Sequence, residues 1–394
     1  MSDIIDGPAC EELVAVSPAR RQARTRLAAR MACVAVAAVM VLLALCGAGP
    51  NAMASMRAAT TSGPSAPDST PSWPAPTAGM LALRAANPAP GRLERLPDGR
   101  QLHMTVVGSG RPTVVMEAGA GDWSLTWCLV APRVARGSSR VAGTRVVTYD
   151  RAGLGWSDPT GRPPTATGYV RDLHDGLKGA GIRPPYVLVG HSMGGVYARL
   201  YAHRYPLEVA GVVLVDPGDE RLPVAVGAQS AAAIASGAAA MATLSAQKAR
   251  QAATGAFVDD PSGLPTDPRW PAGTTAPYHA LYAADPWVFQ TIGLEAGAAV
   301  AIWREVAADR ITSLGDIPLA VVRSSKRMGL SGVPALAAHE DRVWRRLQAA
   351  QARESSRGRL IIAPRSDHYV QLADPHLVTT EILRVVAKAR VLAQ

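Results

Sequence analysis

The amino-acid sequence predicts an α/β fold in which helices cover both faces of a mostly parallel, doubly wound sheet. Short apolar, β-prone runs alternate with helical patterns from about residue 113 to residue 392, which is typical of such a sheet. One of these runs passes through a glycine-rich turn, GHSMGG, into a helical pattern. Between about residues 219 and 316 the strand rhythm stops, so a helical cap is expected there, after the strand that follows this turn.

The first elements are a hairpin, two strands and a helix. Residues 92–110 carry an Asp98–Gly99 turn between β-prone runs, which predicts a β-hairpin. The runs PTVVMEAGAG and TRVVTYDRAGLGWSD each indicate a buried strand that ends in a glycine-rich loop. The following stretch, YVRDLHDGLKGAGI, has helical periodicity and ends on glycine.

The later elements repeat this alternation on either side of the cap. Residues 185–206 indicate a strand, a turn and a helix, and VAGVVLVDPG indicates the next strand. After the cap come strands in IPLAVVRSS and GRLIIAPRSDH and a final helix over residues 374–393. The cap is rich in alanine, and its stretch at residues 276–306 carries five aromatic residues, which either line a pocket or attach the cap to the sheet: Tyr278, Tyr282, Trp287, Phe289 and Trp303.

Composition limits the possible functions. Charged residues make up 18% of the chain and hydrophobic residues 48%, which is a globular composition. The formal net charge is +10, but there is no zinc-finger spacing, RNP-type motif or long basic run, so a nucleic-acid partner is not expected. The four cysteines form no CxxC or Cys/His cluster, and neither a metal nor a cofactor is expected.

The N-terminal residues indicate targeting to a membrane. Residues 1–30 carry several arginines and precede the uncharged apolar stretch at residues 31–49. Its length as a helix would be about 28 Å, close to the thickness of a bilayer core. The arginines favour a single-pass anchor with residues 1–30 in the cytoplasm and the rest outside; the alternative is a signal peptide cleaved near Ala54, which would leave a secreted protein. Residues 50–92, rich in Pro, Ser and Ala, are expected to form an extended linker to a domain at residues 93–394.

Ser192, in the centre of GHSMGG, is a candidate nucleophile. In a G-x-S-x-G turn the flanking glycines Gly190 and Gly194 allow neighbouring backbone to pass close by. The serine then projects from the tip of a sharp strand-to-helix turn, and the backbone N–H of Met193 points into the same space, where it can stabilise an oxyanion. The motif alone is common, but here an apolar strand precedes it and an amphipathic helix follows.

The ordered motifs EAGAG, YDRAGLGWSD, GHSMGG, VVLVDP and SDHYVQLADP resemble the α/β-hydrolase superfamily, and most closely its esterase- and lipase-like serine hydrolases with a helical cap. The resemblance covers roughly residues 93–392. It implies that His368, after the last strand, is the base. Ala118–Gly119 stands where the family has His-Gly, so the N–H of Ala120 is the second candidate oxyanion donor. Most members have glycine before the histidine, where this chain has Asp367.

The acid of the implied triad is the open point. The loop after IPLAVVRSS, where the family usually carries it, has no carboxylate. Some members place the acid one strand earlier, which favours Asp216, at the end of VVLVDP; Asp219 and Asp341 are the alternatives. His191, beside the serine, and the loop residues Asp150 and Arg151 are expected to make structural contacts.

The sequence thus predicts a membrane-anchored serine hydrolase of carboxylic esters, acting on small molecules with an apolar group. Thioesterase, acyltransferase and peptidase activities are alternatives within the superfamily. Dehalogenases and epoxide hydrolases of this superfamily use an aspartate nucleophile, and Ser192 argues against both. A non-catalytic, membrane-tethered binding module is the alternative from another class.

Overall fold

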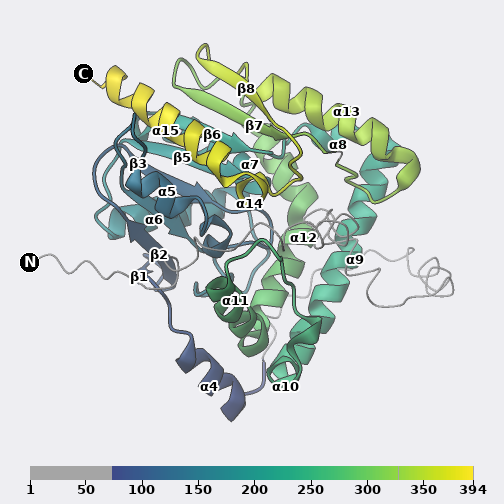
Figure 1. Cartoon of the computed structure of the whole chain (residues 1–394). Helices are drawn as coiled ribbons and strands as arrows, with labels where there is room; N and C mark the ends of the chain where they lie inside the picture. Colours follow the sequence, from purple (N-terminus) through teal and green to yellow (C-terminus); the bar gives the residue numbers. More distant parts are fainter. Residues whose placement is uncertain (1–72, 327, 394) are drawn as a thin grey trace, which may run out of the picture.

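The computed structural model describes residues 73–393 except residue 327, and its centre is one eight-stranded sheet (Figure 1). From edge to edge the strands are β1 (Arg92–Arg95), β2 (Gln101–Val107), β4 (Val146–Tyr149), β3 (Thr113–Glu117), β5 (Tyr186–His191), β6 (Val209–Val215), β7 (Leu319–Ser324) and β8 (Gly358–Ala363). β2 pairs antiparallel with β1 and with β4, and all other neighbours are parallel. The mostly parallel sheet is therefore confirmed.

Successive strand residues enter two separate cores, because side chains of a strand point alternately to its two faces. Val115 and Leu188 pack with α6 (Ala166–Gly179) and α7 (Met193–Arg204) on one face. Their neighbours Val114 and Val187 pack on the other face. That face is covered by α5 (Ala131–Arg136) and α15 (Pro375–Leu392) (Figure 1). Both faces are thus buried, as the sequence predicts.

The remaining elements outside the cap connect these layers. Three are short: the 3₁₀-helices η4 (Ser124–Trp127) and η5 (Pro206–Glu208) and the four-residue helix α14 (Val370–Ala373) after β8. The longer helix α13 (Pro334–Gln351) connects β7 to β8 in the chain. Because β3, β5, β6 and β8 are parallel, their carboxyl ends lie at one edge of the sheet. The loops that carry the candidate site residues meet at this edge.

The cap lies between β6 and β7 in the chain. It consists of α8 (Leu222–Ala225), α9 (Gly227–Ala253), α10 (Ala256–Asp259), η6 (Pro261–Gly263), α11 (Ala272–Ala284) and α12 (Pro286–Ala308). The two longest helices, α9 and α12, lie side by side (Figure 1). Gly293 permits their close approach, since a Cβ there would stand 3.1 Å from the Cβ of Ser245.

Part of the segment expected to be an extended linker is helical instead. α4 (Ala78–Ala86) begins after Thr77, whose hydroxyl accepts the backbone N–H of Met80. Met80 is buried, and Arg84 pairs with Asp285 at the start of α12 at 2.6 Å. The run AGMLALRAA consists mainly of strong helix formers, and contact with the cap stabilises it.

The predicted anchor at residues 31–49 lies outside the described residues. Among the helices between residues 73 and 393, none is both long and apolar enough to cross a bilayer. The membrane prediction therefore stays a prediction.

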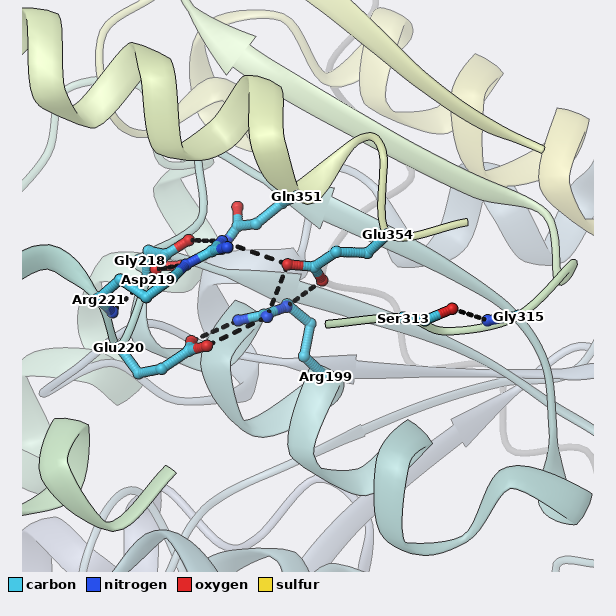
Figure 2. A network of polar contacts seen from close by, with 9 residues as sticks. All are labelled: Arg199, Gly218, Asp219, Glu220, Arg221, Ser313, Gly315, Gln351 and Glu354. Carbon is cyan, nitrogen blue, oxygen red and sulfur yellow. Dashed lines mark hydrogen bonds and ion pairs between the residues drawn. The ribbon is translucent and has the colours of Figure 1, made fainter. Parts of the chain in front are cut away.

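A buried network of charges fixes the segment that leads from β6 into the cap (Figure 2). Arg199 on α7 is fully buried and pairs with Glu220 at 2.5 Å and with Glu354 at 2.8 Å. Gln351 donates to the carbonyl oxygen of Gly218 at 2.7 Å. The segment at residues 218–221 is thereby tied to α7 and to the end of α13.

Replacing Arg199 by methionine should lower the free energy of unfolding by about 3–5 kcal/mol, because the carboxylates of Glu220 and Glu354 would stay buried without the guanidinium. Arg357→Met is the matched control. Its ion pair with Asp316 is largely exposed, at 43% and 75%, and its loss should cost under about 1 kcal/mol. Urea denaturation followed by circular dichroism measures both, and equal effects would contradict the assignment.

Candidate active site

Ser192 stands at a strained turn between β5 and α7. Its backbone has φ 53° and ψ −120°, a conformation that residues with a side chain rarely adopt. A Cβ on Gly190 would lie 2.3 Å from the carbonyl oxygen of Gly194, and a Cβ on Gly194 would lie 2.5 Å from that of Ala118. The two glycines of the motif are therefore required by close backbone contacts, which hold the serine at the tip of the turn.

His368 follows β8 and is bonded to Asp216 at the end of β6. The distance from His368 Nδ1 to Asp216 Oδ2 is 2.7 Å, and both side chains are buried. The other carboxylate oxygen, Oδ1, accepts the N–H of Ser324 at 3.0 Å and the amide of Gln348 at 2.9 Å. Burial by itself raises the pKa of Asp216, but the hydrogen bond and charge of His368 outweigh it and hold that pKa below its ordinary value.

The two other candidate acids are engaged elsewhere. Asp219 pairs with Arg221 at 2.5 Å, and Asp341 pairs with Arg345 at 2.9 Å. Of the three carboxylates that the sequence left open, the structure thus brings Asp216 to His368. A sequence signal for this choice was the position of Asp216 at a strand end.

The second ring nitrogen of His368, Nε2, is buried and has no hydrogen-bond partner among the described residues. No hydrogen bond within this part of the chain joins it to the Ser192 hydroxyl. Catalytic hydrogen bonds are often long in the absence of substrate and tighten in the complex. His191, directly before the serine, lies against His368, with ring centroids 4.7 Å apart.

His191 supports the loop that carries His368. Burial lowers the pKa of His191 to about 3, so the ring is neutral. Its Nε2 therefore donates to the carbonyl oxygen of His368, at 3.0 Å. This is the structural role that the sequence predicts for His191.

Ser192, Met193 and Ala120 line one cavity of about 280 Å³. Met193 is the first residue of α7, where backbone N–H groups have no acceptor within the helix. Ala120 belongs to the loop after β3. Both candidate oxyanion donors thus belong to the wall of the cavity that holds the serine.

Arg151 is buried and holds the loop after β3 in place. This is a structural role, as the sequence predicts for this residue. Its guanidinium donates to the carbonyl oxygens of Ala118 at 2.8 Å and Gly119 at 2.6 Å. It also pairs with Glu295 of α12 at 2.9 Å. Glu295 in turn accepts the N–H of Gly121 at 2.6 Å. A cap residue that sequence reasoning missed therefore helps to position this loop.

The cavity lies between the sheet edge and the inner faces of α9 and α12. Residues spaced three or four apart on each helix line it, from Ile234 to Lys248 and from Phe289 to Trp303. Each stretch rises about 21 Å, so the cavity is elongated. Four of the five aromatic residues singled out in the sequence line it, Tyr278, Tyr282, Phe289 and Trp303, and Trp270 of the cap lines it too. Tyr278 also stacks on Trp123 at 4.3 Å, so it both lines the pocket and attaches the cap.

Asp367, where the family usually has glycine, connects the cap to the loop of His368. Its carboxylate accepts two hydrogen bonds from Arg269 of the cap, at 2.8 and 2.9 Å. It also accepts the backbone N–H of Tyr369 at 3.0 Å. The sequence shows that Asp367 departs from the family pattern. It does not show that Arg269, almost a hundred residues away, is the partner of Asp367.

The sequence match places the chain in a known family. The model of the alpha/beta hydrolase family matches residues 106–381, and the chain belongs to this family. An AB hydrolase superfamily protein of Gibberella zeae is 25% identical over 74% of this chain and 92% of its own length. An uncharacterised protein of Schizosaccharomyces pombe is 35% identical over 35% of this chain. The match spans only 30% of that protein, and the first curated relatives are all matched over less than half of their length.

Solved structures share the fold at low sequence identity. An esterase from Exiguobacterium antarcticum has a TM-score of 0.51 and 17% identity, with 75% of this chain and 99% of that chain covered. A Pseudomonas aeruginosa protein provisionally named an epoxide hydrolase has a TM-score of 0.54 and 20% identity, with coverage of 75% and 94%. These similarities confirm the α/β-hydrolase fold. The type of reaction has to be inferred from the residues of the site.

Asp122, which lines the cavity, should give stability an unusual pH dependence. Burial raises the pKa of its carboxyl to about 6, above the ordinary value of 3.8. Between these two values the unfolded chain loses its proton first, so the folded state becomes less stable as pH rises. Relative to wild type, Asp122→Asn should therefore gain about 2–3 kcal/mol in unfolding free energy between pH 4 and pH 7.

Urea denaturation of both proteins at pH 4, 5, 6 and 7 measures this difference. Asp98→Asn is the control, since burial raises the pKa of that carboxyl but the hydrogen bonds and charge of Arg100 hold it below its ordinary value. This variant should not become relatively more stable as pH rises. A constant difference between wild type and Asp122→Asn would contradict the raised pKa.

Proposed function

We propose that this protein is a serine hydrolase that cleaves carboxylic esters of small molecules with apolar groups. The hydrogen bond from His368 to Asp216, in a loop against the Ser192 turn, is the observation that carries the proposal. A buried carboxylate bonded to Nδ1 orients the imidazole, so that Nε2 is left to accept a proton. The apolar, elongated cavity beside Ser192 supports the substrate class.

In the first half of the reaction Ser192 Oγ attacks the acyl carbon, and Nε2 of His368 takes the serine proton. Asp216 stabilises the imidazolium that forms, because its charge lies 2.7 Å from Nδ1. The N–H groups of Met193 and Ala120 hold the oxyanion. When the ester C–O bond breaks, the imidazolium gives its proton to the leaving alcohol and an acyl-enzyme remains.

In the second half a water molecule attacks the acyl-enzyme. His368 takes one proton from the water and returns it to Ser192 Oγ as the bond from Oγ to the acyl carbon breaks. The free acid leaves and the enzyme is restored. All proton transfers use groups of this chain, so the proposed reaction involves no metal and no cofactor.

We also propose that residues 31–49 anchor the enzyme in the cell membrane, with the hydrolase domain outside the cytoplasm. The arginines before this segment and its uncharged, apolar composition support this. Fractionation of cells should then find the full-length chain in the membrane, with the hydrolase domain accessible to added protease. A shorter chain in the medium would instead indicate a cleaved signal peptide.

Substitution of the three residues should separate their roles. With p-nitrophenyl esters from acetate to palmitate, Ser192→Ala and His368→Ala should each lower kcat on the order of a million-fold. Asp216→Asn should lower it roughly ten-thousand-fold, because an amide can hold the imidazole in the wrong tautomer, with the proton on Nε2. Asp341→Asn, which removes a buried carboxylate with a different partner, is the control and should keep most of the activity.

A fluorophosphonate probe tests the nucleophile without a chosen substrate. Labelling should require both Ser192 and His368, since the probe reacts with an activated serine. If folded wild-type protein neither hydrolyses esters nor reacts with the probe, the enzyme proposal is wrong and a binding module is favoured. Ester hydrolysis that survives Ser192→Ala would assign the reaction to another nucleophile.

A further inference from the structure

Asp122 is the unusual carboxylate of the cavity. It is 5% exposed and lies two residues beyond Ala120 in the loop after β3. The other acidic residues that line the cavity have arginine partners: Asp267 pairs with Arg269 at 2.5 Å and Glu295 with Arg151 at 2.9 Å. Asp122 has no ion pair among the described residues, and its Oδ2 has no hydrogen-bond partner there.

The hydroxyl of Tyr369, which also lines the cavity, is a hydrogen-bond partner of this carboxylate, and the charges of Arg151, His368 and Glu295 also act on it. Burial and then the charge of Asp122 raise the pKa of the Tyr369 hydroxyl, so the hydroxyl stays protonated. Tyr369 directly follows His368, whereas Asp122 follows Ala120 by two residues. The two side chains therefore come from the loop of the candidate base and the loop of the candidate oxyanion donor.

The aromatic part of the cavity begins beside Asp122. Trp123, the next residue, stacks on Tyr278 at 4.3 Å, and Tyr278 lies 5.0 Å from Tyr282 between ring centroids. The charge of Asp122 acts on the hydroxyls of both Tyr278 and Tyr282, so a ring or other apolar body bound beside these tyrosines would lie near the Asp122 carboxylate. A carboxylate at this place can accept a hydrogen bond from such a ligand but has nothing to offer to a purely apolar one.

We propose that Asp122, together with Tyr369, recognises a hydrogen-bond donor that the substrate carries close to its scissile ester. The donor is a hydroxyl or an amino group on an otherwise apolar, ring-bearing ester. This rests on the proposed function, because it places the donor beside the carbonyl that Ser192 attacks. A ligand without the donor would bury the carboxylate unpaired, and sites of this kind discriminate strongly against such analogues.

The test compares matched esters on the full-length protein. On the acyl side these are the p-nitrophenyl esters of 3-phenylpropanoic acid, 2-hydroxy-3-phenylpropanoic acid and phenylalanine. On the alcohol side they are the propyl, 2-hydroxyethyl and 2-aminoethyl esters of 3-phenylpropanoic acid. In one of these series kcat/KM should favour a donor-bearing ester roughly 10- to 100-fold, the range for a hydrogen bond to a charged group.

Variants of Asp122 identify the group responsible. Asp122→Leu should abolish the preference while the donor-free ester is hydrolysed at least as fast as before. Asp122→Asn keeps an acceptor without the charge, so it should retain more of a preference for a hydroxyl than of one for an amine. Ser245→Ala, which removes another buried polar group of the cavity wall, is the matched control and should leave the ratio unchanged.

A competition experiment needs no variant. Phenylalaninol or 3-phenylpropane-1,2-diol should protect Ser192 from the fluorophosphonate at a concentration at least tenfold lower than 3-phenylpropanol does. Equal protection, equal rates in both ester series, or a preference that survives Asp122→Leu would overturn the role of Asp122. If wild type reacts with the probe but shows no preference, only the role of Asp122 is overturned. If wild type does not react with the probe, the proposed function is overturned as well.

Discussion

The close backbone packing around the Ser192 turn is the constraint on which the rest of the site depends. Gly190 and Gly194 let the turn press against itself and against the carbonyl of Ala118 at the end of β3. The carbonyl oxygen of Ser192 also accepts the N–H of Gly218, beyond the end of β6. One turn thereby fixes the relative positions of three loops, which carry the candidate oxyanion donor, the serine and the segment after Asp216.

Buried charges then attach the cap to this centre. Arg151 and Glu295 join α12 to the loop after β3, and Arg269 joins the cap to Asp367 beside His368. Both ties end within a few residues of a candidate catalytic group. A movement of the cap would therefore displace the loop that carries Ala120 and the loop that carries His368. The position of the cap and the geometry of the candidate site are coupled in this way.

The polar and apolar residues that line the cavity are unevenly distributed. Its walls are mostly apolar and aromatic, and two of its acidic residues are neutralised by arginines. Asp122 is the exception, and it lies where the loop after β3 meets the aromatic part of the cap. Under the proposed role of Asp122, such a pocket would select ligands by shape through most of its length and by hydrogen bonding at one point.

The sequence by itself determined the mostly parallel sheet, the Ser192 turn and the cap, because strand periodicity and turn chemistry are local properties. It also indicated Asp216 and His368 as neighbours, through the ends of two strands, but it left Asp219 and Asp341 open. Only the tertiary structure separated these acids, and only it revealed the partners Glu295 and Arg269 and the burial of Asp122 without an ion pair among the described residues. Ion pairs and burial join residues far apart in the chain, and no periodicity in the sequence records them.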